Sequence, residues 1–206
     1  MSITRNLLAT ALLASAGHAV AASSVDVSVK GTITPTSCTP ALANGGVVDF
    51  GKLSAKDLRP NQHTYLPFQT MNMTVTCEGA TLFAIAAKDN REGSESNLDY
   101  YNFGLGMING SEKLGYLTLA MSGPVADEVN VRAIGSRDGG VTWERESSFT
   151  DDGLASIAEL NTLVPIAVQR LTTNLQVAAF IAPTQGLTLT NEVPLDGSVT
   201  LTVRYL

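Results

Sequence analysis

An alternating apolar pattern near the carboxyl end constrains this chain more than any other feature of its sequence. Between Val199 and Tyr205, apolar residues occupy every second position and polar residues lie between them. A period of two is typical of a strand with one apolar face, and no proline interrupts the run. Asp196-Gly197 before it predicts a turn. Unless neighbouring strands cover it, an apolar strand at the end of a chain predicts a sheet edge with which another chain can pair.

The first 22 residues have the features of an export signal. Arg5 supplies a positive charge, and Leu7 to Ala16 form an apolar stretch that is too short to span a bilayer. Ala19-Val20-Ala21 has the small-x-small form that predicts cleavage before Ala22, and Ala14-Ser15-Ala16 is a second candidate site. We therefore predict export to the periplasm, with residues 23–206 forming one mature domain.

Composition narrows the classes of function. Charged residues make up 16% of the chain, below the usual quarter, which suits an extracellular β-protein. The formal net charge is -6 and no lysine or arginine cluster occurs, so we expect no nucleic acid as a partner. The mature chain retains a single histidine, His63, in a turn where we expect a surface side chain. We predict that the protein is not an enzyme and needs no cofactor.

Two cysteines, Cys38 and Cys77, are present. An even number of cysteines in an exported chain predicts a disulfide. A metal site would need further ligands near them, so we expect no metal here. Four carboxylates that could hold calcium, Asp89, Glu92, Glu95 and Asp99, lack the spacing of a calcium-binding loop, and we expect a solvated loop instead.

Short alternating segments separated by turns recur along the chain and predict an all-β sandwich. Asn109-Gly110 predicts a hairpin turn. A short helix is predicted over residues 151–160, where Leu154, Ile157 and Leu160 fit helical spacing. The predicted strands are residues 25–33, 47–50, 71–77, 82–87, 103–107, 113–121, 129–134, 141–143, 164–168, 171–181 and 199–205.

Taken together, the two ends of the chain resemble subunits of chaperone–usher fimbriae. The resemblance rests on Gly31-x-Ile33 with Cys38 seven residues after the glycine, a second cysteine about 40 residues on, and the penultimate Tyr205. More closely, four segments are similar to the β-type fimbrial-subunit-like family, a family catalogued as a domain of unknown function. These segments are Val29 to Cys38, Val47 to Gly51, Lys88 to Gly93 and Leu195 to Leu206.

The resemblance implies an immunoglobulin-like sandwich that lacks its final strand. In such subunits a periplasmic chaperone fills the gap, and at the outer-membrane usher the N-terminal extension of another subunit replaces it. The chain would then be a structural subunit of a fimbria at the cell surface. The resemblance assigns the groove for the chaperone or donor strand to Gly197, Val199, Leu201, Val203, Tyr205 and Leu206, with the Leu206 carboxylate as the chaperone's anchor.

The beginning of the mature chain has two possible placements. Val25, Val27 and Val29 alternate with polar residues, as a donor strand requires. Alternatively they form the first strand of the chain's own sandwich, which the spacing from Gly31 to Cys38 favours.

A second function is a non-polymerising adhesin or tip-like module with the same fold. Trp143, Tyr100 and Tyr101 would then form a carbohydrate-binding surface for a host or surface receptor, because aromatic rings suit the faces of sugars. The alternative for these rings is a place in the core.

Overall fold

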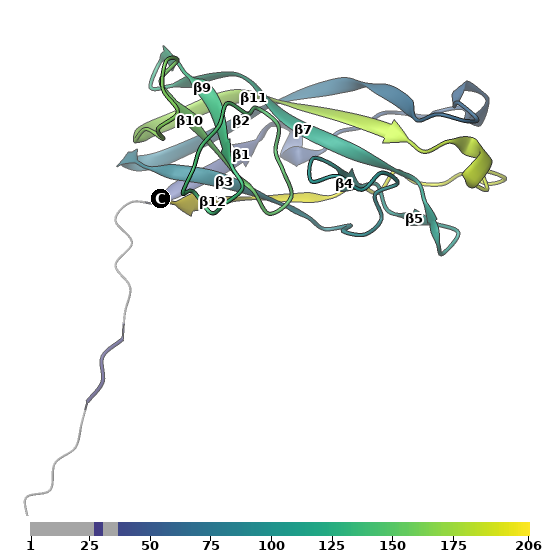
Figure 1. Ribbon diagram of the computed structural model, residues 1–206, viewed down its shortest axis with the longest axis horizontal. Helices are drawn as coiled ribbons and strands as arrows, with labels where there is room; N and C mark the ends of the chain where they lie inside the picture. The colour runs from purple at the N-terminus through teal and green to yellow at the C-terminus, as the bar shows by residue number, and fades with distance from the viewer. Residues whose placement is uncertain (1–26, 31–36) are drawn as a thin grey trace, which may run out of the picture. The chain divides into compact units, whose positions relative to one another are not determined.

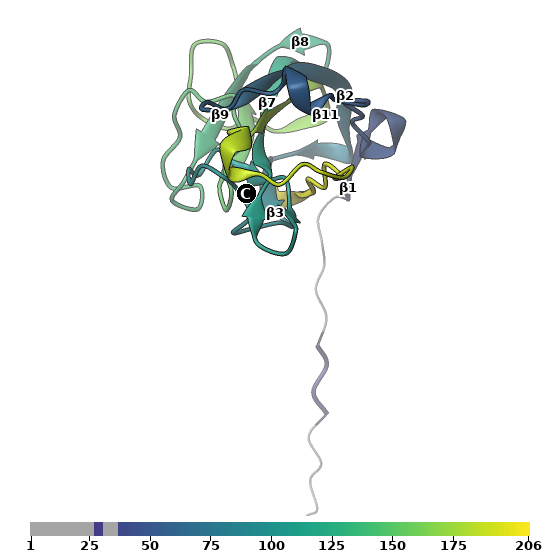
Figure 2. The same ribbon diagram turned by 90° about the vertical axis from the view of Figure 1, so that its right-hand side faces the viewer.

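The computed structural model describes residues 27–30 and 37–206, and residues 35–206 form a unit of their own. Within that unit two antiparallel sheets pack face to face in an immunoglobulin-like sandwich (Figures 1 and 2). The predicted all-β fold is therefore confirmed. In the described part of the chain, three short 3-10 helices, η1 (Ala43–Gly46), η2 (Ala55–Asp57) and η3 (Thr184–Gly186), lie in the connections.

The larger sheet has the strand order β1-β2-β11-β7-β4, with β8 paired to β7. Its long strands β2, β11 and β7 run side by side along the sandwich in Figure 1. At one edge, β1 pairs with the second half of β2 only. The bounds are β1 (Cys38–Leu42), β2 (Thr64–Thr81), β4 (Phe103–Gly104), β7 (Gly115–Ala126), β8 (Val129–Asn130) and β11 (Val168–Ile181).

The smaller sheet has the order β12-β3-β10-β9. β12 is an edge strand, because β3 is its one strand partner in the part of the chain that the structure describes. A separate hairpin, β5 with β6, turns at Asn109 and Gly110, both with positive φ, as the sequence predicts. The bounds are β3 (Phe83–Asp89), β5 (Met107–Ile108), β6 (Glu112–Lys113), β9 (Arg132–Ser136), β10 (Leu154–Ala158) and β12 (Val199–Tyr205).

The core lies between the sheets and follows the period of two. In β2 the side chains of Met71, Met73, Val75 and Cys77 are buried while the residues between them face outward. The predicted disulfide is confirmed, since Cys38 and Cys77 are opposite each other in the β1–β2 register and are bonded. This bond fixes the edge strand β1 to the core strand β2.

Several predicted elements are wrong. Residues 154–158 form a buried strand between β3 and β9 rather than a helix, because a short apolar run fits either period and the two sheet neighbours decide. Residues 141–143 and 164–167 belong to no strand. Residues 47–50 are also not a strand, although Val48 and Phe50 are half-buried on one face, because no strand of residues 27–30 or 37–206 pairs with them.

The N-terminal strand prediction is wrong for the residues that can be checked. Val27 and Val29 are 85% and 90% exposed, and residues 27–30 form no strand. Among the described residues, the first strand of the sandwich is β1, which begins at Cys38. Val25 and the predicted export signal, residues 1–22, lie outside the described residues.

Candidate functional site

The two sheet edges β1 and β12 face each other across an open apolar groove. Each strand is hydrogen-bonded on one side, β1 to β2 and β12 to β3, and within the described residues no strand lies between them. We call this space the groove, with one wall formed by residues 38–58 and the other by residues 189–205. Backbone groups that face an unfilled space of this kind are available to pair with an added strand.

Three connected hollows make up the groove. The first, of about 420 Å³, lies between Pro40 and Leu42 on one wall and Leu201 and Val203 on the other. The second, of about 150 Å³, shares Leu42 and Leu201 with the first. Because neighbouring hollows share lining residues, they form one continuous line between the sheets. At no more than about 3.3 Å per residue, the wall from residue 193 to residue 203 is at most roughly 35 Å long, which leaves room for an extended strand of several residues.

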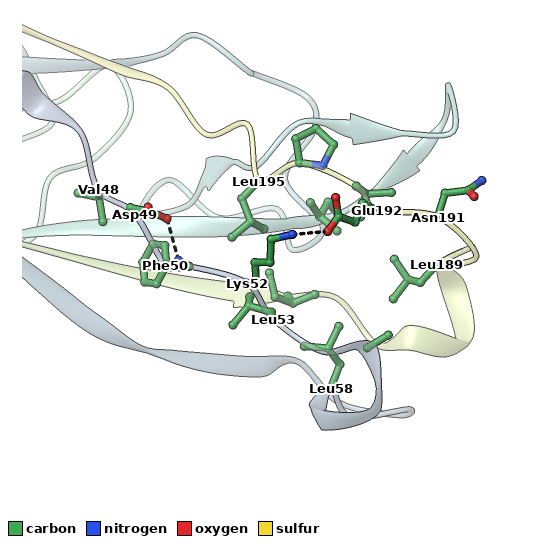
Figure 3. A pocket seen from close by; sticks show the side chains of 16 residues that line it. Val48, Asp49, Phe50, Lys52, Leu53, Leu58, Leu189, Asn191, Glu192 and Leu195 are labelled. Carbon is green, nitrogen blue, oxygen red and sulfur yellow. Dashed lines mark hydrogen bonds and ion pairs between the residues drawn. The ribbon is translucent and has the colours of Figure 1, made fainter.

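The third hollow is the largest, at about 760 Å³, and shares Val48, Phe50 and Leu195 with the second. Figure 3 shows apolar side chains of both walls around it, among them Leu58 and Leu189. Lys52 Nζ lies 2.9 Å from Glu192 Oε1, so one ion pair joins the walls (Figure 3). Both side chains are about nine-tenths exposed, which leaves this pair little energetic weight.

Hydrogen bonds close both ends of the groove. At one end the backbone N–H of Cys38 donates to Tyr205 Oη at 3.0 Å. At the other, the N–H groups of Thr184 and Gln185 donate to the carbonyls of Arg59 and Pro60 at 3.1 and 3.2 Å. The walls are therefore held at a fixed separation at their ends, while the described residues between those ends form no backbone hydrogen bond across the groove.

A polar clamp holds the start of β12 in place. The Arg91 guanidinium donates to both carboxylate oxygens of Asp196, Nε to Oδ2 at 3.0 Å and Nη2 to Oδ1 at 2.8 Å. Asn90 donates through its side chain to the hydroxyls of Ser198 and Thr200, each at 2.9 Å. Both donors belong to Lys88 to Gly93, one of the four segments on which the family resemblance rests. This segment therefore positions the wall of the groove without lining it.

The structure brings four of the six predicted groove residues to the groove. Gly197, Val199 and Leu201 line the middle hollow, and Val203 lines the hollow next to it. Tyr205 closes the end through its hydroxyl. Leu206 is about half exposed, and its side chain lies beside Gly140 rather than in a hollow.

Sequence reasoning missed the opposite wall and the floor. Leu42, Val48 and Phe50 face the groove from the first wall, and Leu105 and Leu117 form its floor at the middle hollow. The alternation of side chains in residues 47–50 could have identified Val48 and Phe50 as sharing one face. It carried no information on whether a strand pairs with these residues, because pairing depends on the rest of the chain.

The carboxylate loop is solvated only in part: Glu92 and Asp99 are exposed as predicted, whereas Asp89 and Glu95 are buried. Asp89 and Glu95 are only 4% and 7% exposed. Burial raises the pKa of Asp89, against the opposing effect of N–H groups of Gly104 and Arg91 that donate to its carboxylate. Among the described residues, no three His, Cys, Asp or Glu side chains are grouped to hold a metal ion. The buried Asp89 carboxylate therefore ties the end of β3 to the Gly104 backbone.

His63 is half-buried rather than simply on the surface. Its Nε2 lies 3.0 Å from the Ser96 hydroxyl, and its ring packs edge-on against Tyr116. These contacts pack His63, which directly precedes β2, against Tyr116 of β7.

No helix in the described part of the chain has the length and apolar character needed to cross a membrane.

Known proteins resemble the chain over nearly its full length. Residues 27–102 match the family described as protein of unknown function (DUF1120). An uncharacterized protein of Escherichia coli (strain K12), YhcF, is 30% identical over 91% of this chain and 93% of its own length. Protein GltF of the same strain is 27% identical over 100% of the chain and 98% of its own length. These matches agree with the part of the resemblance that pointed to a domain of unknown function.

Proposed function

The chain belongs to the DUF1120 family, and from the open groove of its sandwich we propose that it is a structural subunit of a bacterial surface fimbria. The subunit is assembled by the chaperone–usher route, in which a strand from another protein completes the sandwich. The observation that carries this proposal is that β1 and β12, on either side of an apolar groove, each present an edge that no strand of the described residues pairs with.

The energetics of the groove favour a partner. Val199, Leu201 and Val203 are half-buried and turn the same face toward the hollows. Fully burying a valine or leucine side chain stabilises a protein by about 1.5–3 kcal/mol relative to leaving it exposed. Covering these side chains and the facing wall therefore yields several kcal/mol, a large share of the stability of one domain.

The N-terminal valines support a donor role for this segment. Val27 and Val29 lie on one side of an alternating run, and residues 27–30 form no strand. Together with Val25 they supply apolar side chains at the spacing that a groove-filling strand requires. The partners of the subunit are accordingly a periplasmic chaperone, an outer-membrane usher and other fimbrial subunits, and its destination is the cell surface.

A self-complemented variant tests the groove directly. A flexible glycine-serine linker after Leu206, followed by a strand of alternating valine and threonine, supplies the missing strand within the same chain. We expect a rise of several kcal/mol in the free energy of unfolding and less aggregation. The matched control has serine at each valine position, and equal stability of the two variants would contradict an open groove.

Assembly is tested separately in cells that export the chain with its chaperone and usher. Fibres of donor-strand-linked subunits resist detergent, so ladders on unheated gels report polymerisation. We expect Val27→Asp to abolish the ladders while the monomer stays folded, and Ser28→Asp, on the other face of the same run, to retain them. Ladders that persist in Val27→Asp would rule out this segment as the donor.

A further inference from the structure

Two loops that lie far apart in the sequence meet at the aromatic residues Tyr100 and Tyr101. The guanidinium of Arg137 lies over the Tyr100 ring, 4.5 Å from its centroid. The Tyr101 hydroxyl donates to Glu146 Oε2 at 2.6 Å, and this bond contributes most to raising the pKa of Tyr101. The groove contains neither loop, so this cluster has no part in the proposed assembly function.

A hollow of about 270 Å³ opens beside this cluster, and we call it the loop hollow. Arg137 and Glu144 both line it, and Arg137 Nε lies 3.7 Å from Glu144 Oε1, too far for a hydrogen bond. The two Nη atoms of Arg137 donate no hydrogen bond within the described residues. The remaining polar or aromatic lining side chains are Ser136, Asp138, Thr142 and Trp143.

The walls of the loop hollow are held rigidly. Asp138 accepts bonds from the Ser136 and Thr142 hydroxyls and from the N–H groups of Val141 and Thr142. The bonds from Thr142 are the main reason that the pKa of Asp138 lies below its usual range. Trp143 Nε1 donates to the Gly140 carbonyl at 3.1 Å, which fixes the indole. A hollow whose walls are already ordered binds a ligand without a large ordering cost.

The free groups have the chemistry of a site for a neutral carbohydrate. A sugar presents neighbouring hydroxyls, which donate and accept, and an apolar face of C–H groups. Arg137 offers unused donors, Glu144 offers a carboxylate acceptor, and the half-buried Trp143 offers an aromatic surface. Asp138 and Glu144 outnumber Arg137 in the lining, which disfavours an anionic ligand. The oxygens of Asp138 are engaged in the turn, which disfavours a bound cation.

We propose that the loop hollow, bounded by Arg137, Trp143 and Glu144 and backed by Tyr100, is a binding site for a neutral sugar. The site is independent of the groove and of fimbrial assembly. It gives a subunit of this fold a second surface, through which it contacts glycans while its groove is occupied.

The single tryptophan of the chain, Trp143, is a built-in reporter for this site. The exported full-length chain is applied to immobilised glycans ending in neutral hexoses or N-acetylhexosamines, and to the same glycans capped with sialic acid. We expect retention on at least one neutral glycan. The corresponding free neutral oligosaccharide should then change the fluorescence of Trp143 in a saturable manner.

Variants separate a binding site from a merely structural cluster. Arg137→Ala should weaken binding about ten- to hundredfold, since hydrogen bonds from a charged donor are lost. Arg137→Lys keeps the positive charge but loses the forked donors of the guanidinium, so it should also weaken binding. This variant provides the test if Arg137→Ala does not fold. Arg170→Ala, an exposed arginine on the other sheet, should bind as the wild type does.

The proposal is overturned by retention on none of the neutral glycans, by retention on sialylated glycans alone, or by titration that leaves Trp143 fluorescence unchanged. Equal binding by wild type and folded Arg137→Lys would also overturn it.

Discussion

The backbone N–H of Cys38 donates to the hydroxyl of Tyr205 at 3.0 Å, although 167 positions separate the two residues in the chain. Cys38 is simultaneously bonded to Cys77 in β2, and Tyr205 is paired through β12 to Phe83 in β3. One side-chain hydroxyl therefore links the edge of the larger sheet to the edge of the smaller sheet. It fixes how far apart the groove walls stand at this end.

Tyr205→Phe tests this link, because it removes the hydroxyl and retains the ring. Tyr205 is about half exposed, so water can reach the freed Cys38 N–H, and we expect a loss of only about 0.5–1 kcal/mol in the free energy of unfolding. Urea denaturation of the oxidised protein measures it. Tyr205→Ala, which also loses the ring, should cost more. An unchanged midpoint in both variants would show that the link does not hold the groove end.

Side-chain parity was the part of the fold that the sequence predicted well. The faces of Met71 to Cys77 and of Val199 to Tyr205 are as expected, because in a strand parity alone determines which side chains share a face. The same rule fails to distinguish strand from helix in the short run Leu154 to Ala158. There the pairing with β3 and β9, which is set by distant residues, decides the structure.

The sequence predicted one of the two walls of the groove. β12 was identified as a groove wall, whereas the facing wall around Val48 and Phe50 was expected to be an ordinary strand. Local sequence does not show which segments of a sandwich pair with a neighbouring strand and which do not. The contact between the Arg137 guanidinium and the Tyr100 ring could not be predicted either, since it depends on two loops whose positions follow from the register of the whole sandwich.

Two ion pairs beside the groove should differ in their effect on stability. Arg91 forms a two-pronged contact with Asp196 and also donates to its backbone carbonyl, whereas Lys52 and Glu192 meet through one contact and are almost fully exposed. We expect Arg91→Gln to lower the unfolding midpoint and Lys52→Gln to leave it unchanged. Chemical denaturation of both variants gives the comparison, and equal midpoints would contradict the clamp.

The Arg91–Asp196 clamp also predicts a pH dependence. The hydrogen bond from Arg91 holds the pKa of Asp196 below its ordinary value of 3.8. A carboxyl group with a lowered folded-state pKa stabilises the fold above the ordinary value, and this contribution disappears as the pH falls through the folded-state pKa. The stability of the wild type should therefore decline more steeply than that of Asp196→Asn below pH 3.8. Parallel profiles from denaturation at several pH values would argue against the assignment.

Gly197 should tolerate a side chain poorly. A Cβ at this position would lie 2.5 Å from Leu117 Cδ2 and 3.0 Å from Leu105 Cδ2, so both leucines of the groove floor must move. Overpacking of a closed core costs about 1–3 kcal/mol, and because both contacts are terminal methyls beside the middle hollow, the loss here should lie at the lower end of that range. We expect Gly197→Ala to lose stability in that range. Gly186→Ala, where a Cβ would meet nothing within 4 Å, should stay within about 0.5 kcal/mol of the wild type.

Reduction of the disulfide should destabilise the sandwich strongly. Cys38 and Cys77 are 39 positions apart, and the chain-entropy estimate for a loop of this length is roughly 4 kcal/mol. We expect Cys38→Ala/Cys77→Ala, exported and purified under the same conditions, to have a correspondingly lower unfolding midpoint. Because β1 is an edge strand, the loss should appear first as exchange of its backbone amides. Protection of β1 that matches the wild type would contradict this account.

Leu201 and Thr202 are neighbouring residues of β12, and their side chains lie on opposite faces of the strand. Leu201 lines two of the hollows, whereas Thr202 is exposed on the opposite side of the strand. A carboxylate at position 201 remains accessible to water in the empty groove, but an inserted strand would bury it without a partner, which is costly. Leu201→Asp should therefore leave a folded monomer and prevent capture by the proposed periplasmic chaperone, while Thr202→Asp should be captured normally. Co-purification from the periplasm provides the measurement, with hydrogen exchange of β2 and β11 as the check on folding. If Leu201→Asp is captured as well as Thr202→Asp, the chaperone contacts another surface, and the groove is not where this protein meets its partner.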